Sequence, residues 1–191
     1  MPSAAYRHWK TVRAAILNDV EAALNAVGGS GRGRRLALQQ INRAYAVLLS
    51  AEFQGFCREL HDECIDAIKS PIPASLQPII NREFAFNRLL DRGNPNPGNI
   101  GADFNRFGIK FWEELDKADS RVSAWKRSLE FLNDWRNAIA HHVYDVARLG
   151  TMVLRVHQVR EWRTACDRLA RTFDSILREH LESITGMRPW S

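Results

Sequence analysis

The chain has 191 residues, of which 45% are hydrophobic and 26% charged, and its formal net charge is +5. This length suffices for one domain with its own core, so we expect a single domain over residues 1–191, and no apolar run approaches the roughly 18 residues of a membrane span. The positive charge favours an acidic partner, nucleic acid first, although a mildly basic protein without such a partner fits the composition equally well.

The cysteines and the first residues indicate the compartment. The chain has an odd number of cysteines, namely Cys57, Cys64 and Cys166, and no two of them form a C-x-x-C pair. We therefore expect neither a disulfide framework nor a zinc site, and no other pattern indicates a metal or a cofactor. The first residues show no apolar segment followed by a cleavage site, so we expect no signal peptide and a cytoplasmic protein.

Two long amphipathic helices are predicted first. The helix over about 3–26 is marked by apolar residues at steps of three and four, namely Trp9, Val12, Ile16, Val20 and Leu24. Glycines between 28 and 33 would end it. The helix over about 35–69 carries a second such stripe, with Leu38, Ile41, Tyr45, Leu48, Phe56 and Leu60.

The charged residues of the second predicted helix can each have either a functional or a purely structural role. Arg32, Arg34 and Arg35 lie where this helix begins, a place where cations are unfavourable, so they are candidates for contacts to RNA phosphate. A solvated loop is the simpler alternative. Glu52 interrupts the apolar stripe and needs a partner, with Arg136 as our first candidate. Its carboxylate would form a structural ion pair or support a catalytic residue.

The middle of the chain is expected to form shorter helices that are separated by loops. Ser70 to Pro73 should end the second helix, and one or two short helices are predicted over 74–90. Residues 92–99 are rich in turn formers and predict a loop, either a plain connection or the border of a ligand site. A further amphipathic helix is predicted over 99–116, weakened by Gly101 and Gly108.

The last two predicted helices cover 121–141 and 157–184, and residues 143–151 between them are ambiguous. The first carries an apolar stripe of Val122, Trp125, Leu129, Leu132, Trp135 and Ile139. Helices of this length, joined by short connections and without a strand pattern, predict an all-α bundle of about five to six helices.

A polar motif lies at the end of the helix over 121–141. Arg136 and Asn137 are followed by His141, giving R-N-x-x-x-H. In a regular helix Asn133, Asn137 and His141 would share one face, and the long side chain of Arg136 could reach towards them. The alternative is that Arg136 pairs with a carboxylate and His141 is only a polar residue at a helix end, where a cation is favourable.

This motif, in an all-helical chain, resembles the signature of the HEPN superfamily. The resemblance implies a HEPN-like bundle and a metal-independent endoribonuclease of toxin or antiviral-defence type, and the RiboL-PSP-like branch is one that fits. It also implies RNA as substrate, a 2′,3′-cyclic phosphate product, and a site formed across a homodimer. A partner antitoxin or defence-complex protein is compatible with it. The alternative is a non-catalytic module that binds nucleotides or proteins within such a complex.

The resemblance also implies residue roles. Arg136 would bind the phosphate and His141 would be the acid or base, with Asn137, Glu52 and His142 in support. Imidazole and guanidinium suit these tasks at neutral pH. We prefer His141 over His142 because His142 would point to the apolar side of a regular helix. The toxins that pair with nucleotidyltransferase antitoxins carry a Tyr two residues after their His, whereas Tyr144 is three after His141.

Overall fold

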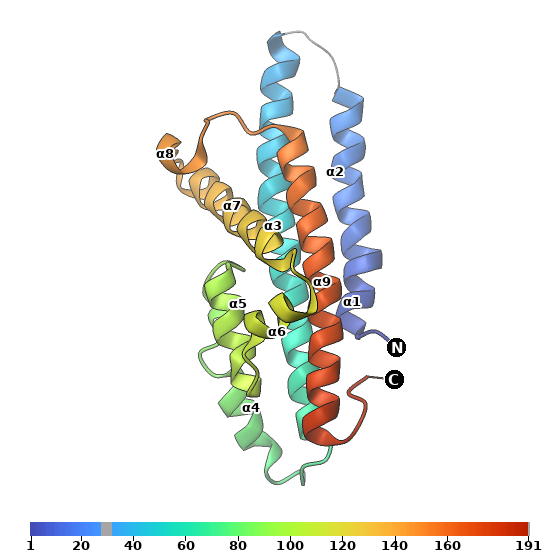
Figure 1. Ribbon diagram of the computed structural model, residues 1–191. Helices are drawn as coiled ribbons and strands as arrows, with labels where there is room; N and C mark the ends of the chain where they lie inside the picture. The colour runs from blue at the N-terminus through green and yellow to red at the C-terminus, as the bar shows by residue number, and fades with distance from the viewer. Residues whose placement is uncertain (28–31, 191) are drawn as a thin grey trace.

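The computed structural model describes residues 1–27 and 32–190, and within these ranges every regular element is a helix. Three long helices, α2 (Ala14–Val27), α3 (Arg32–Lys69) and α9 (Val156–Thr185), run side by side (Figure 1). The helices predicted over 35–69 and 157–184 are confirmed to within a few residues, because their apolar stripes are long and regular.

The first helix contains a π-helical turn that changes its buried face. α1 (Ala4–His8) continues through the π-helical turn Trp9–Arg13 into α2. The extra residue in this turn rotates the face of the helix beyond it, so Leu17 is buried while Val12 and Ile16 are 51% and 38% exposed. The helix over 3–26 is confirmed, but its predicted stripe, which also included Ala23 and Val27, was wrong at Val12, Ile16 and Ala23, because that stripe assumed regular α-helical spacing.

Aromatic rings fill the centre between these helices. The rings of Trp9, Phe53, Phe56 and Phe173 are fully or almost fully buried. Trp9 meets Phe53 at 5.6 Å between ring centroids, and Phe53 meets Phe173 at 6.0 Å. Such edge and tilted contacts add to the burial of large apolar area. The core therefore links the N-terminal helix, α3 and α9.

The middle of the chain is a series of short helices, α4 (Gln77–Ala85), the 3₁₀ turn Leu89–Asp91, α5 (Pro97–Phe104), the 3₁₀ turn Asn105–Phe107 and α6 (Phe111–Ala118). The single helix predicted over 99–116 was wrong. Gly108 adopts a positive φ of 78° and separates α5 from α6, a conformation that favours glycine. These breaks also raise the number of helical segments above the five to six that were expected.

The helix that carries the motif is α7 (Val122–His141), as predicted, and the short α8 (Val146–Leu149) comes after it. α7 packs on α9 and α3 through a buried stripe that includes Val122, Leu129, Leu132 and Trp135. It crosses the long helices obliquely, and its C-terminal end projects to one side together with α8 (Figure 1). The motif therefore lies at the edge of the bundle.

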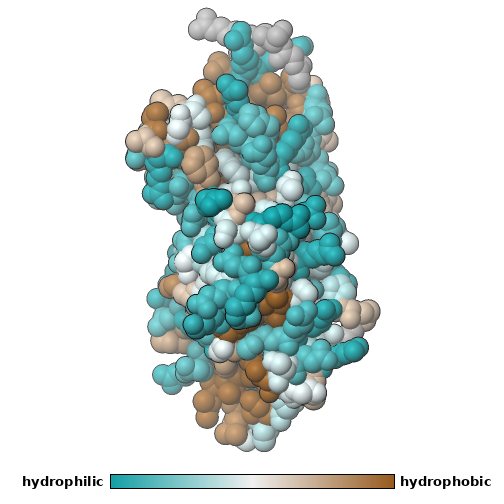
Figure 2. Space-filling view, in the orientation of Figure 1, coloured by the Kyte–Doolittle hydropathy of each residue, from teal (hydrophilic) through white to brown (hydrophobic). Residues whose placement is uncertain are grey.

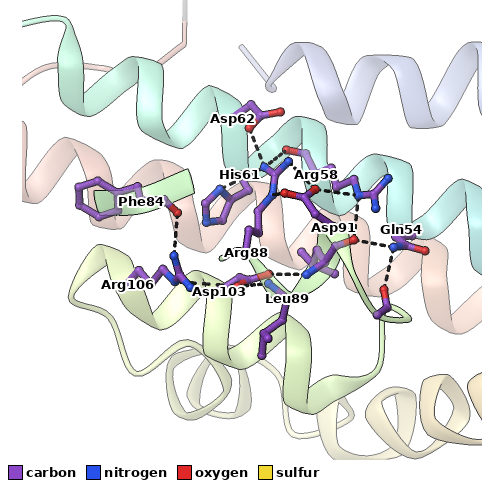
Figure 3. Close-up of polar contacts among 12 residues, drawn as sticks. Gln54, Arg58, His61, Asp62, Phe84, Arg88, Leu89, Asp91, Asp103 and Arg106 are labelled. Carbon is purple, nitrogen blue, oxygen red and sulfur yellow. Dashed lines mark hydrogen bonds and ion pairs between the residues drawn. The ribbon is translucent and has the colours of Figure 1, made fainter. Parts of the chain in front are cut away.

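A polar network holds the segment before α5 against α3 (Figure 3). Arg88 is buried and donates to Asp62 at 2.6 Å and to Asp91 at 2.9 Å. The buried carboxylate of Asp103 accepts from the backbone N–H groups of Leu89 and Leu90. Because the buried guanidinium of Arg88 and the buried carboxylate of Asp103 both have hydrogen-bond partners here, they fix the path of the chain that leads to residues 92–96.

Exposed apolar side chains gather at the end of the molecule where α4 lies (Figure 2). Leu76, Ile79 and Phe86 are 49%, 63% and 60% exposed. No helix within residues 1–27 and 32–190 is both long enough and apolar enough to cross a bilayer.

Candidate functional site at the end of α7

The last turn of α7 places the motif residues at the surface. The helix ends at His141, and His142 closes it in the left-handed conformation with φ 54°, donating its N–H to the carbonyl of Ala138. His141 and His142 are both exposed. The expectation that His142 points to the apolar side was wrong, because that expectation extended a regular helix past its actual end.

Arg136 is partly buried and its guanidinium turns towards the polar side of α7. Its Nη1 donates to the side-chain oxygen of Asn137 at 3.3 Å. Among the residues that the structure describes, no carboxylate pairs with Arg136. This geometry differs from the alternative of a structural ion pair, and it leaves most guanidinium N–H donors for an anion.

Asn137 connects the motif to the loop before α5. Its side-chain oxygen also accepts from Nδ2 of Asn94. The loop is fixed in turn by Gln54, whose Nε2 donates to the carbonyl of Gly93 at 2.8 Å (Figure 3). Part of the loop over 92–99 therefore borders the candidate site, while a contact between this loop and a ligand stays a prediction. Asn94 itself was missed, and the density of Asn in this loop was the only signal for it.

Asn133 does not belong to the exposed polar row that helical spacing predicted. It is 3% exposed, and its Nδ2 donates to the carbonyls of Pro95 at 3.1 Å and Leu129 at 2.8 Å. Its oxygen accepts from Ser50 Oγ at 3.2 Å. The loop before α5 covers this part of α7, so Asn133 is a buried structural residue that helps to seat the loop.

A pocket of about 220 Å³ lies beside His141, between α7 and α8. Its lining includes Asn137, Ala138 and Leu149. Asp134 forms a two-point ion pair with Arg148, whose Nε donates to Oδ2 at 2.8 Å. Arg148 was not predicted, because its link to Asp134 depends on how the segment after α7 folds back.

Glu52 is largely buried, as expected, but its partner is Arg13 and not Arg136. Both side chains are 14% exposed, and Arg13 also donates to Glu59 at 2.6 Å. The prediction of Arg136 as partner was wrong, since the π-helical turn directs Arg13 onto α3. The structure therefore does not bring Glu52 to the motif, and its observed contact is an ion pair between α3 and the first helix.

Arg35, near the start of α3, is not joined to the motif by any contact among the residues that the structure describes. The side chain of Arg32 lies outside the described part of the chain, while Arg34 and Arg35 are exposed. Arg43, two turns further along α3, lies over the ring of Tyr144 at 4.9 Å. Arg35 precedes Arg43 by eight residues, which is about 12 Å along the helix axis. Arg35 is therefore separated along this axis by about that distance from the Tyr144 ring, which comes after the motif. The RNA-binding role of Arg32, Arg34 and Arg35 stays a prediction.

The cysteines are free and fully buried, and burial raises the pKa of the thiols of Cys57, Cys64 and Cys166. Such thiols are unreactive, so none of them is a candidate nucleophile. Within residues 1–27 and 32–190, no three His, Cys, Asp or Glu side chains are grouped so that they could hold a metal ion.

Comparison with known families shows which family the chain resembles. The RiboL-PSP-HEPN family matches residues 13–179 of the chain, which include α3, the whole of α7 and most of α9. Searches among curated proteins and among solved structures gave no match.

Proposed function

The chain belongs to the RiboL-PSP-HEPN family, whose domains are generally ribonucleases, and on this premise we propose that it is a metal-independent endoribonuclease of toxin or antiviral-defence type. The observation that carries the proposal is the environment of the Arg136 side chain. Its guanidinium is partly buried beside Asn137, has no carboxylate partner in the described part of the chain, and lies at the same helix end as the exposed His141. A guanidinium without a carboxylate partner keeps its planar set of N–H donors for a phosphate.

The reaction is transesterification within the RNA. The 2′-oxygen attacks the neighbouring phosphorus and the bond from phosphorus to the 5′-oxygen breaks, which leaves a 2′,3′-cyclic phosphate. A neutral imidazole takes the proton from the 2′-hydroxyl, and a protonated imidazole gives one to the leaving 5′-oxygen. The Arg136 guanidinium binds the non-bridging oxygens and offsets the charge that develops on them.

The reaction needs a base and an acid, and the motif of one chain offers a single preferred imidazole. We propose that a second copy of the chain supplies the other, so that two α7 ends face each other across a two-fold axis. The projection of this helix end from the bundle makes it accessible to a partner copy (Figure 1). Two Arg136 side chains would then bind one phosphate.

A second candidate function is a non-catalytic module within a defence or toxin–antitoxin complex. The exposed apolar side chains at α4, namely Leu76, Ile79 and Phe86, favour a protein partner for this domain. The two functions are compatible, because this surface lies on α4 and the segment after it rather than on α7. An antitoxin or a defence-complex protein would fit such a surface.

The test is RNA cleavage by purified protein in the presence of a chelator. We expect His141→Ala and Arg136→Ala each to lower the rate by about 10²–10⁴ without unfolding the protein. His142→Ala is the comparison variant, since it removes an adjacent exposed imidazole to which we give only a supporting role, and it should lower the rate far less than His141→Ala. The product should carry a 2′,3′-cyclic phosphate. Full activity in a folded His141→Ala protein would refute the assignment, and loss of activity in His142→Ala alone would transfer the role to His142.

A further inference from the structure

The pocket beside His141 is formed by one face of α7 and by the segment after it. Asp134, Asn137, Ala138 and His141 are spaced i, i+3, i+4 and i+7, which places them along one side of the helix. Arg136 is turned about 140° from His141 around the same helix and does not line the pocket. The site therefore has two parts, with the pocket on one side of Asn137 and the Arg136 guanidinium on the other.

The size and the apolar part of the lining favour a small planar group. The pocket measures about 220 Å³ and is open to solvent on one side. It is smaller than the roughly 300–1,000 Å³ of typical ligand pockets, so it suits a single ring system rather than a whole nucleotide. Ala138, Val143 and Leu149 supply apolar contacts for the face of such a ring.

The charges in the pocket exclude phosphate from it. Two carboxylates, Asp134 and Asp145, line it against one guanidinium, Arg148, so the formal charge of the lining is negative while the imidazole of His141 is neutral. A phosphate would meet like charge there, while Arg136 offers an unopposed cation outside. The phosphate should consequently lie on the Arg136 side, which leaves the pocket to an uncharged part of the substrate.

The polar groups of the pocket suit a nucleobase that has an amino group. Asp134 holds Arg148 by two hydrogen bonds, which fixes the guanidinium plane as a surface on which a ring can stack. Asp145 uses its Oδ1 to accept from the N–H of Ala147 at 2.9 Å, and no described group donates to its Oδ2. That carboxylate oxygen can accept from an exocyclic amine, whereas uracil presents a carbonyl oxygen in place of the amine, which the carboxylate repels. The one ring donor of uracil, its N3–H, lies between two such carbonyl oxygens.

We propose that this pocket binds the nucleobase next to the scissile phosphate and selects adenine, cytosine or guanine, which carry exocyclic amines, over uracil. Asp145 is the residue that reads the amine, and Arg148 with Ala138 and Leu149 holds the ring. This inference rests on the proposed ribonuclease function, since it places the reacting phosphate between the pocket and Arg136. It adds to that function a base preference that the motif alone does not determine.

The experiment uses 2′-O-methyl oligonucleotides with a single ribonucleotide, so that only one bond can be cleaved. The base on each side of that bond is varied in turn among the four. At one of the two positions we expect uracil to be cleaved about tenfold more slowly than the amine-bearing bases, the effect of one hydrogen bond to a charged acceptor. Asp145→Asn should abolish this discrimination, because its amide can donate as well as accept.

The variants are chosen to keep the fold. Asparagine caps a helix as well as aspartate does, so Asp145→Asn leaves α8 capped. Asp116→Asn, at an exposed carboxylate on α6 outside the pocket, is the matched control and should keep the wild-type preference. Val143 is 67% exposed at the rim of the pocket, and Val143→Trp should fill it and slow cleavage at every base.

The possible outcomes distinguish a failure of the base-binding proposal from a failure of the ribonuclease proposal. Cleavage without a base preference, or with a preference that Asp145→Asn retains, would overturn the pocket and leave the ribonuclease intact. If no oligonucleotide is cleaved, the ribonuclease proposal fails, and the pocket is then tested by fluorescence anisotropy with uncleavable 2′-O-methyl oligonucleotides. Weaker binding of uracil that disappears in Asp145→Asn would support the pocket, whereas equal binding of all four bases would overturn it.

Discussion

His61 is a fully buried imidazole that should make stability depend on pH. It packs at 4.7 Å between ring centroids against Phe107, and Arg88 donates to its Nδ1 at 3.4 Å (Figure 3). Burial, aided by the positive charge of Arg88, lowers the pKa of His61 to about 3. In the unfolded chain the same imidazole titrates near its ordinary pKa of about 6.5.

The sign of the pH effect depends on which state takes up the proton. Between pH 6.5 and pH 3 the unfolded chain is protonated at His61 and the folded protein is not. The stability contribution is therefore complete above about pH 6.5 and is lost as the pH falls. Each pH unit costs at most about 1.4 kcal/mol of the free energy of unfolding.

Urea unfolding between pH 6.5 and 5 measures this slope while most carboxylates stay ionised. His61→Gln should flatten the pH dependence, whereas His157→Gln, at an exposed histidine, should leave it unchanged. Equal slopes in wild type and His61→Gln would mean that His61 is accessible to protons in the folded protein.

Glu52 gives a second prediction at the scale of one residue. Glu52→Ala removes one of the two carboxylate partners of a largely buried Arg13 and should lower the free energy of unfolding by roughly 1.5–3 kcal/mol. Asp66→Ala, at an exposed i,i+3 pair on the same helix, should change it by no more than about 0.5 kcal/mol. RNA cleavage per folded molecule should survive in Glu52→Ala, and its loss would restore a supporting role at the motif.

Single residues show what the sequence could reveal about the site. A carboxylate within an apolar stripe correctly predicted a buried Glu52, because the cost of an unpaired charge depends only on its immediate surroundings. Its partner lies 39 residues away along the chain, and the spacing of neither helix encodes that pairing. The same holds for Asn94 and Arg148, which reach the motif only after the chain folds back.

At the scale of helices, a glycine explains how two of the short elements pack together. Gly101 lies where α5 approaches the ring of Trp112, and a Cβ there would come within 2.8 Å of it. Trp112 donates its Nε1 to the carbonyl of Pro97 at 2.8 Å, so the ring cannot move away without losing this bond. Gly101 is therefore required for the packing of α5 against α6.

Gly101→Ala should lower the free energy of unfolding by roughly 1–3 kcal/mol through overpacking, despite the better helix propensity of alanine. Gly33→Ala in α3 is the control, since nothing lies within 4 Å of its added Cβ, and it should stabilise by a few tenths of a kcal/mol to about 1 kcal/mol. Thermal unfolding compares the two variants, and a Gly101→Ala protein as stable as wild type would show that Trp112 has room to move.

The helices themselves were predictable to the extent that their stripes are long. α3, α7 and α9 each show many turns of regular spacing, and their predicted ends agree with the structure to within a few residues. Neither the π-helical turn at Trp9–Arg13 nor the break at Gly108 interrupts the apolar pattern enough to be seen. Such local departures are decided by tertiary packing, which a periodicity does not contain.

At the scale of the whole molecule, the proposed homodimer makes activity depend on concentration. If one imidazole comes from each copy, specific activity should fall as the protein is diluted through its dimer dissociation constant. An excess of His141→Ala subunits should inhibit the wild type by forming mixed dimers, while an excess of His142→Ala subunits should not. A stable monomer that cleaves RNA at the undiluted rate would contradict the shared site.

The slight anchoring of α8 has a consequence for hydrogen exchange. Leu149 is its only buried residue, and its tie to α7 is an ion pair whose arginine is 67% exposed. The amides of Leu149 and Gly150, bonded to the carbonyls of Asp145 and Val146, should thus exchange by local opening, much faster than those in the centre of α3. Such local opening would unfold the α8 residues that line the pocket while α7 stays folded. An oligonucleotide that binds in the pocket should slow hydrogen exchange at these two amides. Binding could then be measured even if the oligonucleotide is not cleaved.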